Sequence, residues 1–193
     1  VHMNTEVTKD TVRKEKPDVL LLAIGANPII PKIDGISSAR AMTAEEMYGN
    51  EDSVGEKVAV LGGGLVGCET AAYLGRLGKQ VSIIEMREDI ALDSDIFYQA
   101  AVKVDMRKTK IKIIVNASGE AVTDEGLIIQ KQDDSKELVQ ADTVINAVGY
   151  KANYKLFEEL SQEAPIVQMI GDCRKPGKVT NAVADGYYLA LEI

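Results

Sequence analysis

Histidine and cysteine are scarce in this sequence, which has one histidine, His2, and two cysteines, Cys68 and Cys173. The cysteines lie 105 positions apart and form no C-x-x-C pair, so no metal site is expected. With no second histidine, a Cys–His nucleophile and a Ser–His–Asp triad are excluded as well. We therefore expect no catalytic side chain of these kinds. Any chemistry is expected to be carried by backbone groups, carboxylates or a cofactor.

Positive charge and long apolar runs are also lacking. Lys and Arg number 22 against 30 Asp and Glu, which gives a formal net charge of −8. Nucleic-acid binding depends on clustered cations that meet phosphates, so a nucleic-acid partner is excluded. The longest clean apolar run, residues 19–24, is far shorter than the ~20 residues that span a bilayer. No basic leader precedes an apolar core, so we expect a cytoplasmic protein without membrane contact.

The sequence does contain an alternation of strand and helix patterns. Apolar runs predict buried strands, and the segments between them carry apolar residues on one helical side. In chain order the expected strands are 57–61, 80–84 and 110–115, and the expected helices are 65–77 and 95–106. Such alternation favours an α/β fold, here a Rossmann-like parallel sheet with helices on both faces.

Other segments extend this prediction. Thr43 and Glu46 form a capping box that predicts a short helix. Short segments after Gly119, separated by acidic turns, predict an antiparallel β-meander. The runs DVLLLAIG (18–25) and DTVINAVG (142–149) share one spacing, in which Asp leads Ala by five positions and Gly by seven.

We infer that both of these runs are strands that lead to a boundary between two nucleotide-binding domains. The run at 18–24 is expected to be buried on both faces, as in parallel sheets. A helix is expected to close the chain over residues 181–193.

One motif carries recognisable chemistry. GGGLVG (residues 62–67) has the form G-x-G-x-x-G, between a predicted strand and a predicted helix. The first glycine permits a tight turn, the second lets a pyrophosphate approach the backbone, and the last lets the helix pack closely. Free N–H groups and the dipole at the helix start then attract phosphates. The candidate cofactor-binding residues here are Gly62, Gly63, Gly64, Leu65, Val66 and Gly67.

The second part of this fingerprint is an acidic residue at the end of the next strand. Glu85 lies there, 23 positions after Gly62. Its carboxylate can accept hydrogen bonds from a ribose 2′-hydroxyl and would repel a 2′-phosphate, which favours NAD(H) over NADP(H). Arg87 lies close enough to hold a 2′-phosphate and weakens that preference. Cys68 is interpreted as an apolar core residue, although a helix N-terminus lowers thiol pKa values.

With these motifs in place, nearly the whole chain resembles the flavoprotein pyridine-nucleotide reductases, in which an NAD(P) domain interrupts an FAD domain. Four segments carry the resemblance: AIG at 23–25, AVG at 147–149, IGD at 170–172, and the tail VTNAVADGYYLALEI. Within that group, GDCRKPGKVTNAVADGY is most similar to the C-terminal region of Old Yellow Enzyme-type NADH oxidases, 2,4-dienoyl-CoA reductases and 2-enoate reductases.

The resemblance implies roles for further residues. Gly25, Ala147 and Gly149 would lie at the crossings between the domains. Gly171, Asp172, Thr180 and Asn181 would lie on the flavin side, and Glu69 matches a position near the nicotinamide. In these enzymes NADH reduces FAD, and electrons pass through an iron–sulfur cluster to FMN in a separate barrel outside the present chain.

The resemblance also implies a division into domains. Residues 1–44 and 141–193 would be two pieces of an FAD-binding domain, and residues 45–140 the NAD(H)-binding domain. The chain has one G-x-G-x-x-G where the full pattern has two. We therefore expect a fragment of a larger NADH-dependent flavin oxidoreductase, whose partners are the missing barrel and FAD-domain portions. The isolated chain is expected to lack FAD and to be inactive.

Two alternatives remain open. A related region of trimethylamine dehydrogenase holds ADP without hydride transfer, so a non-catalytic ADP- or NAD-binding module would need the same glycines and carboxylate. A fragment of an NADH-dependent disulfide reductase would need a redox cysteine pair outside this chain. No oligomeric state follows from the sequence.

Overall fold

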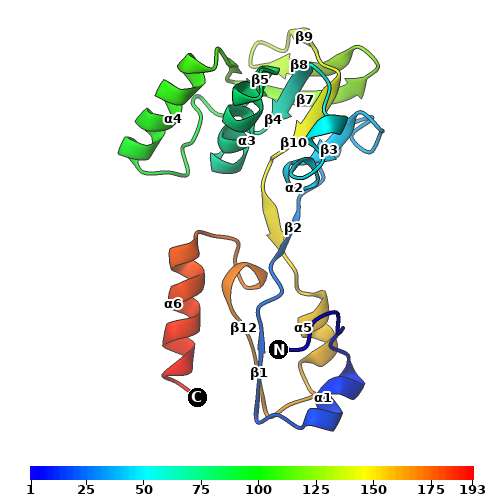
Figure 1. Cartoon of the computed structure of the whole chain (residues 1–193), viewed down its shortest axis with the longest axis vertical. Coiled ribbons are helices and arrows are strands. Elements are labelled where there is room, and N and C mark those ends of the chain that lie inside the picture. The colour runs from blue at the N-terminus through cyan, green and yellow to red at the C-terminus, as the bar shows by residue number, and fades with distance from the viewer. The chain divides into compact units, whose positions relative to one another are not determined.

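The computed structural model describes residues 1–193, which form two compact units (Figure 1). Pro28–Gly149 makes up the inserted unit, and Val1–Asn27 with Tyr150–Ile193 makes up the two-segment unit. The sequence placed these divisions at 44/45 and 140/141. The boundaries of the two units lie instead at 27/28 and 149/150, because β3 (Ala41–Thr43) and β10 (Thr143–Asn146) pair within the sheet of the inserted unit. The assignment of the units to NAD and FAD binding stays a prediction.

The inserted unit is built on a five-stranded parallel sheet in the order β3-β10-β4-β5-β6. Its remaining strands are β4 (Lys57–Leu61), β5 (Gln80–Ile84) and β6 (Lys112–Ile114). Helix α3 (Leu65–Arg76) connects β4 to β5, and α4 (Ile96–Lys108) connects β5 to β6. The predicted α/β class and its strand–helix alternation are confirmed.

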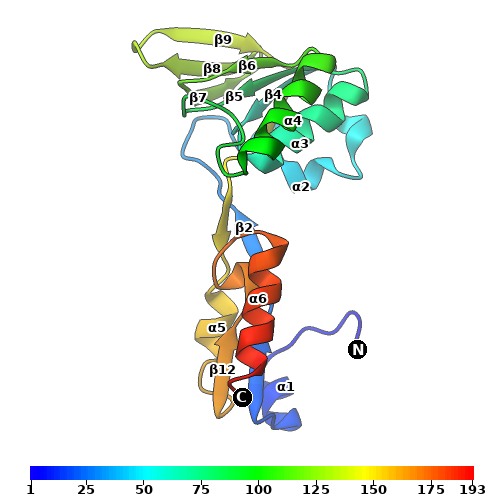
Figure 2. The same cartoon turned by 90° about the vertical axis from the view of Figure 1, so that its left-hand side faces the viewer.

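The two faces of this sheet have different covers (Figure 2). Val58 and Val60 pack with α2, α3 and α4, whereas the alternate residues Ala59 and Leu61 pack under a meander. The meander is antiparallel, as predicted, and consists of β7 (Ala117–Thr123), β8 (Gly126–Lys131) and β9 (Lys136–Gln140). Helices therefore cover one face, and the expectation of helices on both faces is corrected: the apolar side chains of the meander bury the second face.

The predicted capping box is present at the start of α2 (Ala44–Met47). The Thr43 hydroxyl accepts a hydrogen bond from the Glu46 backbone N–H at 3.2 Å, and the Glu46 carboxylate accepts one from the Thr43 N–H at 2.7 Å. Met47 is fully buried in the helix-side core. A short 3-10 helix, η1 (Glu51–Ser53), then leads into β4.

The register of the sheet brings three strand ends together. Leu61 at the end of β4 pairs with Ile84 of β5 on one side and with Asn146 of β10 on the other. The backbone N–H of Gly62 continues this pairing by donating to the carbonyl of Ile84 at 2.8 Å. The segments that follow all three strands therefore begin at one edge of the sheet, where doubly wound folds bind ligands.

The two-segment unit has its own small core. Strand β1 (Val19–Leu22) pairs in parallel with β12 (Ile166–Met169), and helices α1 (Lys9–Glu15) and α5 (Lys155–Leu160) complete the cluster. Val12, Leu22 and Leu160 are its buried residues. The prediction that β1 is buried on both faces is wrong, because this strand has one neighbour and Leu21 is 39% exposed.

Helix α6 (Val179–Ala190) is the last helix of the chain, and none of its residues is buried. The apolar side chains of Val179, Val183, Tyr187 and Tyr188 along it are exposed. The remaining elements of the chain are η2 (Gly171–Cys173) and the paired strands β2 (Ala26–Pro28) and β11 (Tyr150–Ala152). No helix in the protein has the length and apolar character needed to cross a membrane.

Candidate functional site

The turn between β4 and α3 depends on a glycine at position 62. Gly62 has φ +107°, a conformation that side-chain-bearing residues rarely adopt. A Cβ built on it would lie 2.4 Å from the carbonyl oxygen of Ala147, which follows β10. The sharp turn that places the following residues at the sheet edge is thus available only to glycine.

Gly67, the last glycine of the motif, allows close packing, whereas Gly64 leaves space. A Cβ on Gly67 would lie 1.9 Å from the carbonyl oxygen of Gly62, so helix α3 contacts the turn without room for a side chain. A Cβ on Gly64 would meet the Asp93 carboxylate at 3.5 Å, an ordinary contact. Gly64 is therefore not required by internal packing, and its absent side chain leaves space beside the helix start.

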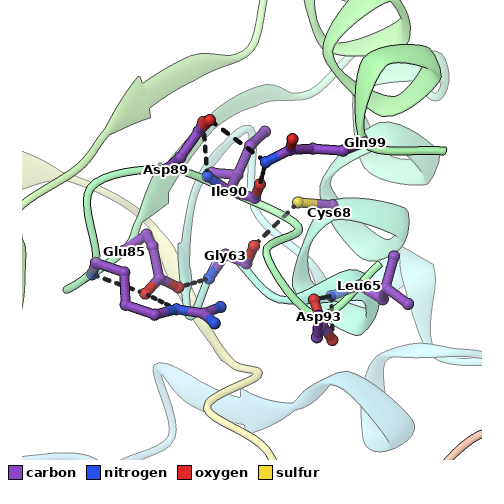
Figure 3. A network of polar contacts seen from close by, with 9 residues as sticks. Gly63, Leu65, Cys68, Glu85, Asp89, Ile90, Asp93 and Gln99 are labelled. Carbon is purple, nitrogen blue, oxygen red and sulfur yellow. Dashed lines mark hydrogen bonds and ion pairs between the residues drawn. The ribbon is translucent and has the colours of Figure 1, made fainter. Parts of the chain in front are cut away.

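The first turn of α3 presents a backbone donor to that space. Gly64 is the N-cap and contributes no side-chain acceptor, so the opening N–H groups need partners from elsewhere. The N–H of Leu65 donates to both oxygens of the Asp93 carboxylate, each at 3.2 Å (Figure 3). The helix start thus holds an anionic group, as the helix dipole favours.

Glu85 follows β5 and lies directly beside the glycine turn (Figure 3). It is 5% exposed, and its Oε2 accepts a hydrogen bond from the Gly63 N–H at 2.6 Å. Its Oε1 accepts two more, from the Arg87 N–H at 2.9 Å and from Arg87 Nε at 3.0 Å. The two strand ends are joined by this carboxylate, and Arg87 is paired with it.

Cys68 lies inside the first turns of α3 and is fully buried. Its Sγ donates to the carbonyl of Gly63 at 3.3 Å. Burial, with the negative charge of Asp93 nearby, raises the pKa of the thiol to about 12. The effect of burial exceeds that of the helix N-terminus, so this residue belongs to the core.

We expect Cys68 to resist alkylation while the protein is folded. At pH 8, a pKa of about 12 makes reaction roughly a thousandfold slower than for an ordinary thiol, because the thiolate is the reactive form. Iodoacetamide labelling followed by mass spectrometry of the Cys68 peptide measures this directly. Denaturant should restore rapid labelling, and fast labelling of the native protein would contradict the assignment.

Glu69 has a partner on the neighbouring helix. The Tyr98 hydroxyl of α4 donates to Glu69 Oε1 at 2.6 Å. The bond to this carboxylate raises the pKa of Tyr98, since it stabilises the protonated phenol. Glu69 is therefore held in place at the exposed surface of the inserted unit.

Ala147 follows β10 and lies beside the glycine turn, and Gly149 lies two positions further along the chain. The Ala147 N–H donates to the carbonyl of Leu61 at 2.8 Å, which extends the sheet by one bond. Gly149 has φ +122°, and its carbonyl accepts a bond from the Ile29 N–H at 2.9 Å. In the two-segment unit, Gly25 also has positive φ, +70°.

The flavin-side candidates of the two-segment unit make local contacts. Asp172 accepts a bond from the Gly177 N–H at 3.1 Å, and Asn181 accepts one from the Lys178 N–H at 2.9 Å, capping α6. The Gly171 N–H donates to Asp185 at 3.1 Å. Thr180 lies in the first turn of α6, among exposed apolar side chains.

Two residues of the site were missed by sequence reasoning, Asp93 and Tyr98. Asp93 bonds to a residue 28 positions away, and one acidic residue in a loop rich in them gives no signal of its own. Tyr98 reaches Glu69 across 29 positions. The packing of α4 beside α3 brings Tyr98 to Glu69, and the loop that precedes α4 brings Asp93 to Leu65.

Comparisons with known proteins agree with this architecture. Residues 1–186 match the family described as Pyridine nucleotide-disulphide oxidoreductase. The whole chain is 31% identical to cinnamate reductase of Clostridium sporogenes and 32% identical to NADH oxidase of Thermoanaerobacter brockii, covering 29% and 31% of those proteins.

A solved structure of a 2-naphthoyl-CoA reductase complex superposes with a TM-score of 0.92 at 32% identity, over 98% of this chain and 29% of that one. The chain thus spans about a third of the length of the relatives it matches. The resemblance to the NAD/FAD-binding region of such flavoenzymes is confirmed. This chain belongs to the pyridine nucleotide-disulphide oxidoreductase family.

Proposed function

We propose that the inserted unit binds NAD(H) and serves as the electron-input part of a larger flavin-dependent oxidoreductase, where it positions nicotinamide for hydride transfer to FAD. The observation that carries the proposal is the helix start beside Gly64, where the Leu65 N–H already binds an anionic carboxylate. Buried Glu85 lies beside the same turn. The names of the relatives, NADH oxidase and cinnamate reductase, support a redox role.

In this proposal each part of the dinucleotide has its own residues. The pyrophosphate binds at Gly64 and Leu65, the adenine-side ribose at Glu85, and the nicotinamide near Glu69 and Gly149. Bound nicotinamide supplies the hydride, so the protein contributes stacking and orientation more than an acid or base. Tyr98 supports this role by fixing the carboxylate of Glu69.

We further propose a preference for NAD(H) over NADP(H). The Glu85 carboxylate would repel a 2′-phosphate at the position where it accepts hydrogen bonds from ribose hydroxyls. Arg87, the cation that would favour NADP(H), directs its Nε and its N–H to Glu85 Oε1. That pairing reduces its capacity to hold a phosphate.

FAD is proposed for the larger protein and not for this chain alone. Gly25, Gly171, Asp172, Thr180 and Asn181 are its proposed neighbours here, and the exposed apolar side of α6 fits burial against further polypeptide. The partners proposed are the remaining FAD-domain portion and a barrel with FMN and an iron–sulfur cluster. We propose a cytoplasmic location and no activity for the isolated chain.

Calorimetric titration of this chain with NADH, NADPH and ADP tests the proposal. We expect NADH to bind more tightly than ADP and NADPH, with a change in nicotinamide fluorescence. Equal affinity for ADP and NADH without that change would contradict hydride delivery and favour a non-catalytic ADP- or NAD-binding module. Adenosine, which lacks phosphates, is the control for binding through the base alone.

A further inference from the structure

The loop between β5 and α4, residues 85–95, lies over the glycine turn and is fixed at several points (Figure 3). The Ala91 N–H donates to the carbonyl of Gly63 at 2.7 Å, and Ile90 is fully buried in the core. Asp89 accepts from the Ile90 N–H at 2.9 Å and pairs with Lys103 of α4. The first half of the loop is therefore anchored.

After Ala91 the loop passes from buried to exposed residues. Ala91 has φ +52°, and the next residue, Leu92, is 41% exposed. Asp93 is also exposed, yet its carboxylate points back to the start of α3 and takes the Leu65 N–H with both oxygens at 3.2 Å. The same carboxylate lies 3.5 Å from where a Cβ of Gly64 would be. It therefore borders the space that the absent glycine side chain leaves.

This is the space in which the proposed function requires a pyrophosphate. A phosphate oxygen would need the Leu65 N–H that Asp93 occupies, and two like charges at one helix start repel each other. The exposed Asp93 side chain can turn to solvent while buried Ile90 stays in place. The two anions are thus alternatives for one donor.

We propose that Asp93 is a built-in competitor of the dinucleotide: its carboxylate closes the phosphate-binding helix start and must leave before a pyrophosphate-bearing ligand binds. This inference rests on the proposed function. Asp93 thereby sets the affinity of the site, and any change that withdraws its carboxylate opens it.

The test compares Asp93→Ala and Asp93→Asn with wild type in titrations with ADP-ribose, which carries the pyrophosphate without nicotinamide, and with adenosine, which carries no phosphate. We expect Asp93→Ala to bind ADP-ribose roughly 3- to 10-fold more tightly, because a competing charge-assisted contact is removed. Asp93→Asn keeps an acceptor but loses the charge, so its gain should be smaller. Adenosine affinity should stay unchanged.

Glu88→Gln is the matched control, since Glu88 is an exposed carboxylate of the same loop. It removes one negative charge and should leave ADP-ribose affinity within about 2-fold, because exposed charges interact weakly through water. An equal gain in Glu88→Gln would overturn the inference by showing that net charge alone is responsible.

The remaining outcomes separate the two proposals. If wild type binds ADP-ribose and Asp93→Ala gains nothing or binds more weakly, Asp93 is a structural helix cap and the inference fails while the proposed function stands. Binding that appears only in Asp93→Ala supports both. If neither protein binds ADP-ribose, although thermal unfolding shows both to be folded, the proposed function fails and the inference with it.

Discussion

Gly64→Val is expected to lower NADH affinity roughly 10- to 100-fold, because the new side chain fills the space where a phosphate would meet the Leu65 N–H and the charge-assisted bonds there are lost. The substitution should leave the fold intact. Gly64 has φ −68°, which any residue adopts, and its Cβ would meet Asp93 at an ordinary 3.5 Å. Calorimetric titration with NADH, together with thermal unfolding, measures both effects.

Gly67→Ala is the contrasting variant. Its Cβ would lie 1.9 Å from a backbone oxygen of the turn, so the helix has to move. We expect its free energy of unfolding to fall by at least about 2 kcal/mol, as in overpacked cores. Loss of NADH binding in Gly67→Ala thus reports damage to the fold, whereas loss in a stable Gly64→Val reports a blocked site. Unchanged NADH affinity in Gly64→Val would contradict the proposed pyrophosphate position.

The architecture of the inserted unit could be predicted because its signals are local. Strand β4 appears in the sequence as the apolar run 58–61 after Lys57, and α2 as a capping box at Thr43 and Glu46. The cover of the sheet could not be predicted in the same way. Val58 and Ala59 are apolar on opposite faces, a pattern that requires burial on both sides without specifying helix or meander.

The candidate site was predictable where its residues belong to one motif. The glycines and Glu85 follow from spacing along the chain, and the structure brings Gly63 and Glu85 within hydrogen-bonding distance. The interpretation of Cys68 as an apolar core residue is confirmed, and burial raises the pKa of its thiol although the residue lies near a helix N-terminus. Burial depends on long-range packing that a local pattern does not contain.

Glu85→Ala has the second large expected effect. We expect NADH affinity to fall about 10- to 100-fold and the preference over NADPH to narrow, because the variant loses the acceptor for the ribose hydroxyls together with the charge that repels a 2′-phosphate. The free energy of unfolding should also fall by about 1 to 3 kcal/mol, since the Gly63 N–H loses its buried partner. Parallel titrations with NADH and NADPH give the selectivity.

Because Glu85 supports the turn and is also the proposed ribose ligand, two further variants separate these roles. Glu85→Gln can keep an oxygen for Gly63 while removing the charge, so NADPH should gain relative to NADH with a smaller loss of stability. Arg87→Ala removes one hydrogen bond to Glu85 Oε1, from Nε at 3.0 Å, keeps the bond from the backbone N–H, and leaves the carboxylate charge in place. NADH affinity should then change by less than about 3-fold, because the Arg87 side chain is 44% exposed and water screens its charge. If Glu85→Ala and Glu85→Gln both keep wild-type selectivity, Glu85 is an architectural residue of the turn and the discrimination lies elsewhere.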